Sequence, residues 1–75
     1  MKQYFIHDTP QDRKAVTEWC DNLFGPRAIP GDFRRWNWFP LFQRKGHLVF
    51  RVDIQESDDQ IVFELTWKDF IVVTE

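Results

Sequence analysis

The sequence predicts a small α+β domain in which a single helix packs on one face of an antiparallel sheet. Three observations support this fold class. Residues 10–24 have the apolar spacing of an amphipathic helix, and residues 47–55 alternate between apolar and polar side chains as a half-buried strand does. Residues 61–68 alternate in the same way. The predicted order is β-α-β-β-β, with a short fifth strand as an option at the C-terminal end.

Length and composition indicate one domain that spans residues 1–75. A single core of this size rarely supplies more than about 3 to 5 kcal/mol of stability, so a dimer or a large partner would help to stabilise it. Cys20 is the only cysteine, and the first residues contain no apolar run as long as a signal peptide. We therefore expect a cytoplasmic protein. No window approaches the 18 apolar residues of a membrane span, so we expect no membrane association.

The N-terminal third predicts a strand followed by a helix. Residues 3–7 are aromatic and β-branched, which is typical of a short strand. Thr9 and Pro10 are good residues for a helix start, and Gly25 with the following proline ends the helix near Phe24. The apolar stripe of this helix consists of Ala15, Val16, Trp19, Cys20, Leu23 and Phe24.

The rest of the chain predicts two β-hairpins. The first strand runs from about Arg35 to Gln43 and is bent near Pro40, because proline cannot donate a hydrogen bond to a neighbouring strand. Residues 44–46 form a three-residue turn to the strand over residues 47–55.

A turn at residues 56–60 then leads to a strand over residues 61–68. The alternation ends at Lys68 and Asp69, and the apolar residues 70–73 predict a bend followed by a short last strand.

Thirteen of the 75 residues are aromatic, which is more than a core under one helix requires. The aromatic residues expected in that core are Phe5, Trp19, Phe24, Phe50, Phe63 and Trp67. The surplus lies in a central stretch where aromatic and basic side chains alternate, a composition typical of binding hot spots. The candidate partner-binding residues are Phe33, Arg34, Arg35, Trp36, Trp38, Phe39, Phe42, Arg44 and Lys45. The alternative is that these aromatic residues form a second small core beneath the loop that precedes them.

Charge is distributed unevenly along the chain. Residues 27–51 contain six basic residues and one acidic residue, whereas residues 52–75 contain seven acidic residues and one basic residue. Bases stacked on rings, with phosphates held by arginine and lysine, would make the central stretch a site for single-stranded nucleic acid. The acidic segment opposes this interpretation, unless it mimics phosphate toward a basic partner. Alternatively, Arg35 and Arg51 form ion pairs with Asp53 and Glu64 on neighbouring strands.

Other residues give weaker signals for chemistry. Cys20 lies on the apolar stripe of the helix, where a free cysteine behaves as a small buried hydrophobic residue. His7 and His47 could join Asp8 or Asp53 at a metal, but their spacing matches no metal-binding motif, and both are expected at strand ends. The sequence contains no glycine-rich phosphate loop and no recognisable catalytic triad. We therefore expect no enzyme activity, no metal and no cofactor.

These observations favour a small non-enzymatic protein-binding module that engages a larger cytoplasmic protein through the central stretch. A second copy of the chain is an alternative partner. Compact stand-alone domains of this kind often act as inhibitors or adaptors, including phage-encoded proteins that target a host protein. The hypothesis from a different class is single-stranded nucleic-acid binding through the same arginine and tryptophan residues.

Overall fold

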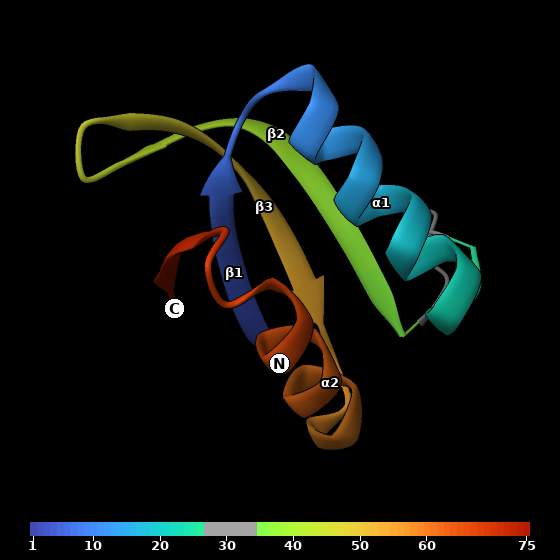
Figure 1. The fold of residues 1–75 in the computed structure, drawn as a ribbon. Helices are drawn as coiled ribbons and strands as arrows, with labels where there is room; N and C mark the ends of the chain where they lie inside the picture. Colours follow the sequence, from blue (N-terminus) through green and yellow to red (C-terminus); the bar gives the residue numbers. More distant parts are fainter. Residues whose placement is uncertain (27–34) are drawn as a thin grey trace.

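The computed structural model describes residues 1–26 and 35–75 and confirms the predicted α+β class with one antiparallel sheet (Figure 1). Its elements are β1 (Lys2–His7), α1 (Pro10–Phe24), β2 (Trp36–Arg44), β3 (His47–Ile54), α2 (Ser57–Trp67) and β4 (Ile71–Thr74). The strands lie in the order β2-β3-β1-β4, and each neighbouring pair is antiparallel. Neither described helix has the length and apolar character needed to cross a membrane.

Each helix connects two strands that run in the same direction. β1 and β2 are both antiparallel to β3, which lies between them, and β3 and β4 are both antiparallel to β1. A connection between parallel strands has to cross a face of the sheet and normally requires a helix. The resulting βαββαβ connectivity is the arrangement of ferredoxin-like domains, which host many unrelated functions.

The predicted strand over residues 61–68 is wrong, because this segment belongs to the helix α2. With it, the expected single helix and the β-α-β-β-β order are corrected to two helices and βαββαβ. In the helix only Phe63 of the alternating apolar residues is fully buried, whereas Ile61 and Leu65 are 57% and 72% exposed. As the hairpin partner of residues 47–55, the predicted strand would have lain beside β3, but β2 and β1 occupy both sides of β3. The strand β4, which was expected as an optional fifth strand, pairs with β1. The helix α2 therefore forms the connection that crosses the sheet from β3 to β4.

Both helices lie on the same face of the sheet, and the core fills the space between the two layers (Figure 1). The buried residues of this core are Tyr4, Ile6, Val16, Cys20, Phe24, Trp36, Phe50, Val52, Ile54 and Phe63. Trp19 and Trp67 pack against it as predicted, but they are only partly buried. Phe5 is fully buried as predicted, yet it belongs to the opposite face of the sheet.

Local sequence signals explain α1. The Thr9 hydroxyl accepts a hydrogen bond from the backbone N–H of Asp12 at 3.1 Å, as an N-cap does. Gly25 ends the helix with φ of 89°, a region that favours glycine, and its N–H donates to the Asp21 carbonyl. The buried stripe is narrower than predicted, because Leu23 is half exposed.

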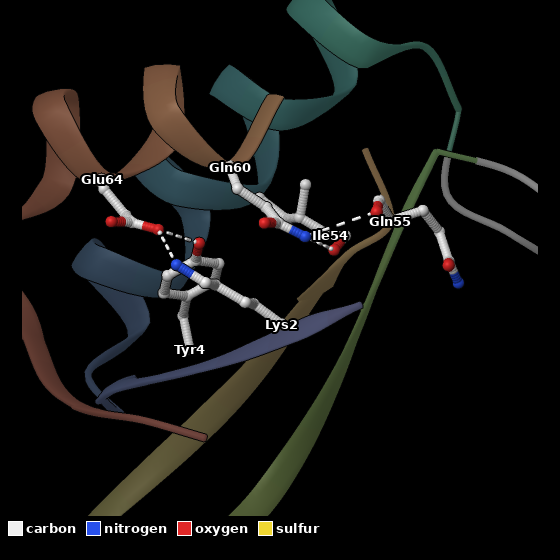
Figure 2. Close-up of polar contacts among 6 residues, drawn as sticks. All are labelled: Lys2, Tyr4, Ile54, Gln55, Gln60 and Glu64. Carbon is white, nitrogen blue, oxygen red and sulfur yellow. Dashed lines mark hydrogen bonds and ion pairs between the residues drawn. The ribbon is translucent and has the colours of Figure 1, made fainter. Parts of the chain in front are cut away.

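Polar contacts attach α2 to the sheet at two points (Figure 2). Near its start, the Gln60 side-chain amide donates to the carbonyl of Ile54 at 2.9 Å, and this contact is buried. One turn later, the Glu64 carboxylate accepts from the Tyr4 hydroxyl at 2.5 Å and from the Lys2 ammonium at 3.1 Å. These contacts fix the position of α2 over β1 and the end of β3.

Candidate partner-binding surface

A β-bulge in β2 determines which side chains share a face of the sheet. Phe39 and Phe42 pair with Arg51 and Val49, so two residues of β2 between the phenylalanines lie opposite a single residue of β3. In a regular strand, residues three apart point to opposite faces. The extra residue of the bulge restores the same direction, so both phenylalanines lie on the face away from the helices.

Leu41, at the centre of this bulge, combines an unfavourable backbone conformation with an exposed apolar side chain. Its φ is 68°, in the left-handed region that costs an L-residue roughly 1 to 2 kcal/mol. Its side chain is 77% exposed, so packing in the described chain does not compensate for this cost. Strain of this kind concentrates at functional sites.

The face that neither described helix covers, which we call the open face, contains a compact Phe–Arg cluster beside the bulge. Its members are Phe5, Phe39, Phe42, Arg44 and Arg51. The Arg44 guanidinium carbon lies 4.3 Å from the centre of the Phe5 ring. That of Arg51 lies 4.5 Å from the Phe39 ring and 5.0 Å from the Phe42 ring. These distances are within the range of cation–π contacts. Arg44 and the edge-on ring of Phe42, whose centre lies 5.8 Å from that of Phe5, pack on Phe5, which is fully buried on a face that no described helix covers.

Carboxylates pair with both arginines of the Phe–Arg cluster. Arg44 Nε lies 2.7 Å from Glu75 Oε2, and Arg51 donates to Asp53 at 3.1 Å. Burial raises the pKa of Asp53, and the nearby Arg51 guanidinium only partly offsets that rise. The cluster and its two carboxylates therefore present no excess of positive charge.

The structure divides the predicted binding residues between the two sides of β2. Trp36 is 2% exposed, and its indole N–H donates to the Gly25 carbonyl at 2.6 Å, so the prediction of an exposed Trp36 is wrong. Trp38 is half-buried and packs edge to face on Phe50. Both tryptophans pair with helix-facing residues of β3, which places them on the core side. Phe39, which was predicted to bind a partner together with these tryptophans, lies instead on the open face.

The basic residues of the predicted site also separate. Arg35 makes two hydrogen bonds to Asp59 at the start of α2, at 2.6 and 2.9 Å, instead of the expected pairs with Asp53 or Glu64. The expected Arg51–Asp53 pair is present, but within one strand. Lys45 is exposed in a two-residue turn, shorter than the three residues predicted. Phe33 and Arg34 lie outside the described residues.

Trp36 and Trp38 also border a shallow groove of about 230 Å³ between α1 and β2. Its other described lining residues are Thr17, Glu18 and Asp21, so its rim is acidic. This groove and the Phe–Arg cluster lie on opposite sides of the sheet. The predicted continuous patch of tryptophan and arginine is therefore not a single surface among the described residues.

Cys20 is buried as predicted, and burial raises the pKa of its thiol, which disfavours the reactive thiolate. Within residues 1–26 and 35–75, no three His, Cys, Asp or Glu side chains gather as a metal site.

Sequence reasoning missed Phe5, Leu41 and Arg51 as members of the candidate surface. The bend expected at Pro40 indicated a change of alternation in β2, but not the number of extra residues. One extra residue there reverses the alternation, so the face shared with Phe39 continues at Phe42 and Arg44 rather than at Gln43, and Leu41 is exposed at the bulge between them. Comparisons with protein-family models, curated proteins and solved structures found no match for this chain.

Proposed function

We propose that this protein is a small non-enzymatic protein-binding module, an inhibitor or adaptor, that binds a larger cytoplasmic protein through the open face. The contact surface consists of the Phe–Arg cluster and the exposed bulge residue Leu41, which adjoins the cluster in the sequence between Phe39 and Phe42. The observation that supports this most directly is the bulge, which holds an exposed leucine in a strained conformation beside half-buried phenylalanine and arginine side chains. A protein partner that covers Leu41 would bury its apolar surface and compensate for the strain.

The chemistry of these side chains favours binding over catalysis. Phenylalanine and leucine side chains cannot transfer protons, and arginine stays protonated at all physiological pH values. Phenylalanine and arginine side chains are, by contrast, enriched at protein–protein interfaces relative to the rest of the protein surface. Because the two arginines are already stacked and ion-paired, they lose little conformational entropy when a partner binds.

The variant Leu41→Asn tests this proposal. Asparagine tolerates a positive φ better than leucine, so we expect the variant to be as stable as the wild type or more stable, by up to about 1 kcal/mol. We also expect it to lose partner binding at least tenfold, because the exposed apolar side chain is gone. Urea unfolding measures the first effect. Affinity capture followed by calorimetry with the captured protein measures the second.

Gln43→Ala is the matched control, because Gln43 is exposed in the same strand but two positions beyond the bulge residue. It should leave both stability and binding unchanged. A partner that binds wild type and Leu41→Asn equally well would contradict the proposed surface. A partner lost equally with Gln43→Ala would move the interface to the other side of β2.

Single-stranded nucleic acid is the second candidate, because an open four-stranded sheet with aromatic residues is also a platform on which bases stack. The ion pairs of Arg44 with Glu75 and of Arg51 with Asp53 make nucleic acid the weaker candidate, because they cancel the positive charge that would bind phosphates. Light-scattering mass with and without a short mixed-sequence oligonucleotide distinguishes the candidates. A monomer whose mass does not change when the oligonucleotide is added agrees with a protein partner. A mass increase that is abolished by salt would instead show that the protein binds nucleic acid and would contradict the proposal. A dimer would identify a second copy as the partner.

A further inference from the structure

The two histidines of the chain, 40 residues apart, form a close pair at the hairpin end of the open face. His7 Nε2 lies 2.8 Å from His47 Nδ1, and the ring centres are 4.5 Å apart with planes at 79°. Both side chains are exposed, so solvent and ions reach them. Neither residue belongs to the Phe–Arg cluster or to the core.

The sheet holds both histidines in place. His7 ends β1 in register with Val49, and the next residue donates its backbone N–H to the carbonyl of Leu48 at 2.9 Å. His47 begins β3 opposite Arg44, directly after a tight turn. The two turn residues, Lys45 and Gly46, have φ of 52° and 78°, as in a type I′ hairpin. The ring nitrogens are therefore positioned by paired backbone on both sides.

We propose that His7 and His47 form a two-histidine site for a divalent transition-metal ion, with Cu²⁺ preferred over Zn²⁺. Imidazole nitrogen is a common ligand of copper, nickel and zinc. With metal–nitrogen bonds of about 2.0 to 2.1 Å, neighbouring ligands at about 90° lie about 2.9 Å apart, and tetrahedral ligands about 3.4 Å apart. The observed 2.8 Å is close to the spacing of neighbouring ligands around square Cu²⁺ and Ni²⁺. A tetrahedral Zn²⁺ requires the rings to separate.

Binding changes the hydrogen bonding of the pair in a defined way. In the free protein one ring nitrogen of the pair donates its proton to the other. Both facing nitrogens must present lone pairs to a metal, so each ring carries its proton on the nitrogen that faces away. Water or a group of a bound partner would complete the coordination, since no third ligand is gathered among the described residues. Arg44, opposite His47, has its charge balanced by Glu75.

The experiment is a calorimetric titration of the untagged protein with Cu²⁺, Ni²⁺ and Zn²⁺, each as the metal alone. An untagged chain has only these two imidazoles. We expect one Cu²⁺ per chain and weaker binding of Zn²⁺. His7→Ala and His47→Ala should each weaken Cu²⁺ binding about tenfold or more, because even changes behind a metal ligand cost about 10- to 100-fold. Lys14→Ala, at an exposed position of α1, is the control that should change nothing.

Nuclear magnetic resonance provides an independent readout, because paramagnetic Cu²⁺ broadens the signals of nearby nuclei. Broadening at sub-stoichiometric Cu²⁺ should centre on His7 and His47. Wild-type affinity in either histidine variant, or broadening centred on the terminal amine, would overturn the proposal. Zn²⁺ bound as tightly as Cu²⁺ would overturn the proposed geometry. Thermal unfolding of both variants should match that of the wild type, since exposed substitutions rarely change stability by more than about 0.5 kcal/mol.

Discussion

Trp36 and Leu41 lie five positions apart in the same strand and have opposite environments. Trp36 is an aromatic residue in a stretch that resembles a binding site, yet it is 2% exposed in the core. Leu41 is an aliphatic residue that would normally be buried, yet it is 77% exposed. Hydrophobicity alone therefore does not separate core from binding residues in β2. The direction of each side chain does.

Trp36→Ala should unfold the protein. Truncation of a buried tryptophan costs about 3 to 5 kcal/mol, which is as large as the whole stability expected of a core this small. The change also leaves the Gly25 carbonyl without the indole donor. Circular dichroism should show no cooperative thermal transition at neutral pH.

Trp38→Ala is the matched comparison, because Trp38 is half-buried in the same strand and faces the same side. It should keep a cooperative transition with a lower midpoint. If Trp36→Ala unfolds at the wild-type temperature, the assignment of Trp36 to the core is wrong.

At the scale of elements, α2 shows why alternation alone does not define a strand. Residues 61–67 are apolar at every second position, which fits a strand, but Gln60, Phe63 and Trp67 also fall on one side of a helix. Asp58 and Asp59 in the first turn favour the helix, because acidic side chains interact well with the positive helix end. The outer side of α2 consequently exposes Ile61, Val62 and Leu65.

Val62→Ala distinguishes the helix from the strand that the sequence suggested. Val62 is 43% exposed, so its packing contributes little, and alanine has a higher helix propensity by roughly 0.5 kcal/mol. We expect the variant to be slightly more stable in urea unfolding.

The control is Val72→Ala in β4, where valine is half-buried in a strand. This substitution should lower stability, because alanine disfavours strands and leaves space. A loss of stability in Val62→Ala as large as that in Val72→Ala would contradict the helical assignment.

At the scale of the whole molecule, both helices cover one face of the sheet, and no described helix covers the other face. The apolar core joins the layers, and Glu64 adds a polar contact between α2 and β1. The hydrogen bond from Tyr4, followed by that from Lys2, lowers the pKa of Glu64 below its usual range. Burial, with a contribution from Glu64, raises the pKa of the Tyr4 hydroxyl, which therefore stays protonated as a donor at neutral pH.

Tyr4→Phe tests this contact through the pH dependence of stability. A carboxyl group whose pKa is lowered by folding stabilises the folded state above its unfolded pKa of about 4.3. That contribution is lost as the pH falls through the lower, folded value. We expect Tyr4→Phe to be less stable than wild type at pH 7, with a smaller difference at pH 3. Urea unfolding at the two pH values measures both differences. Equal differences would show that the hydroxyl acts through packing alone.

Local interactions allowed the sequence by itself to determine several elements. Thr9 and Gly25 define the ends of α1, and strict alternation defines β3. The location of the turn before β3 and the bend at Pro40 follow from backbone preferences of single residues, although the turn is one residue shorter than predicted. The α+β class and the burial of Cys20 also followed from these patterns.

Only the tertiary structure decided which face each side chain of β2 occupies and that residues 57–67 are helical. A single extra residue in a strand reverses its alternation. The sequence pattern does not reveal how many extra residues a bulge contains. The helix is required because β3 and β4 run parallel with β1 between them, so their connection must cross the sheet. That requirement depends on strand order, which arises from contacts between residues distant in the chain.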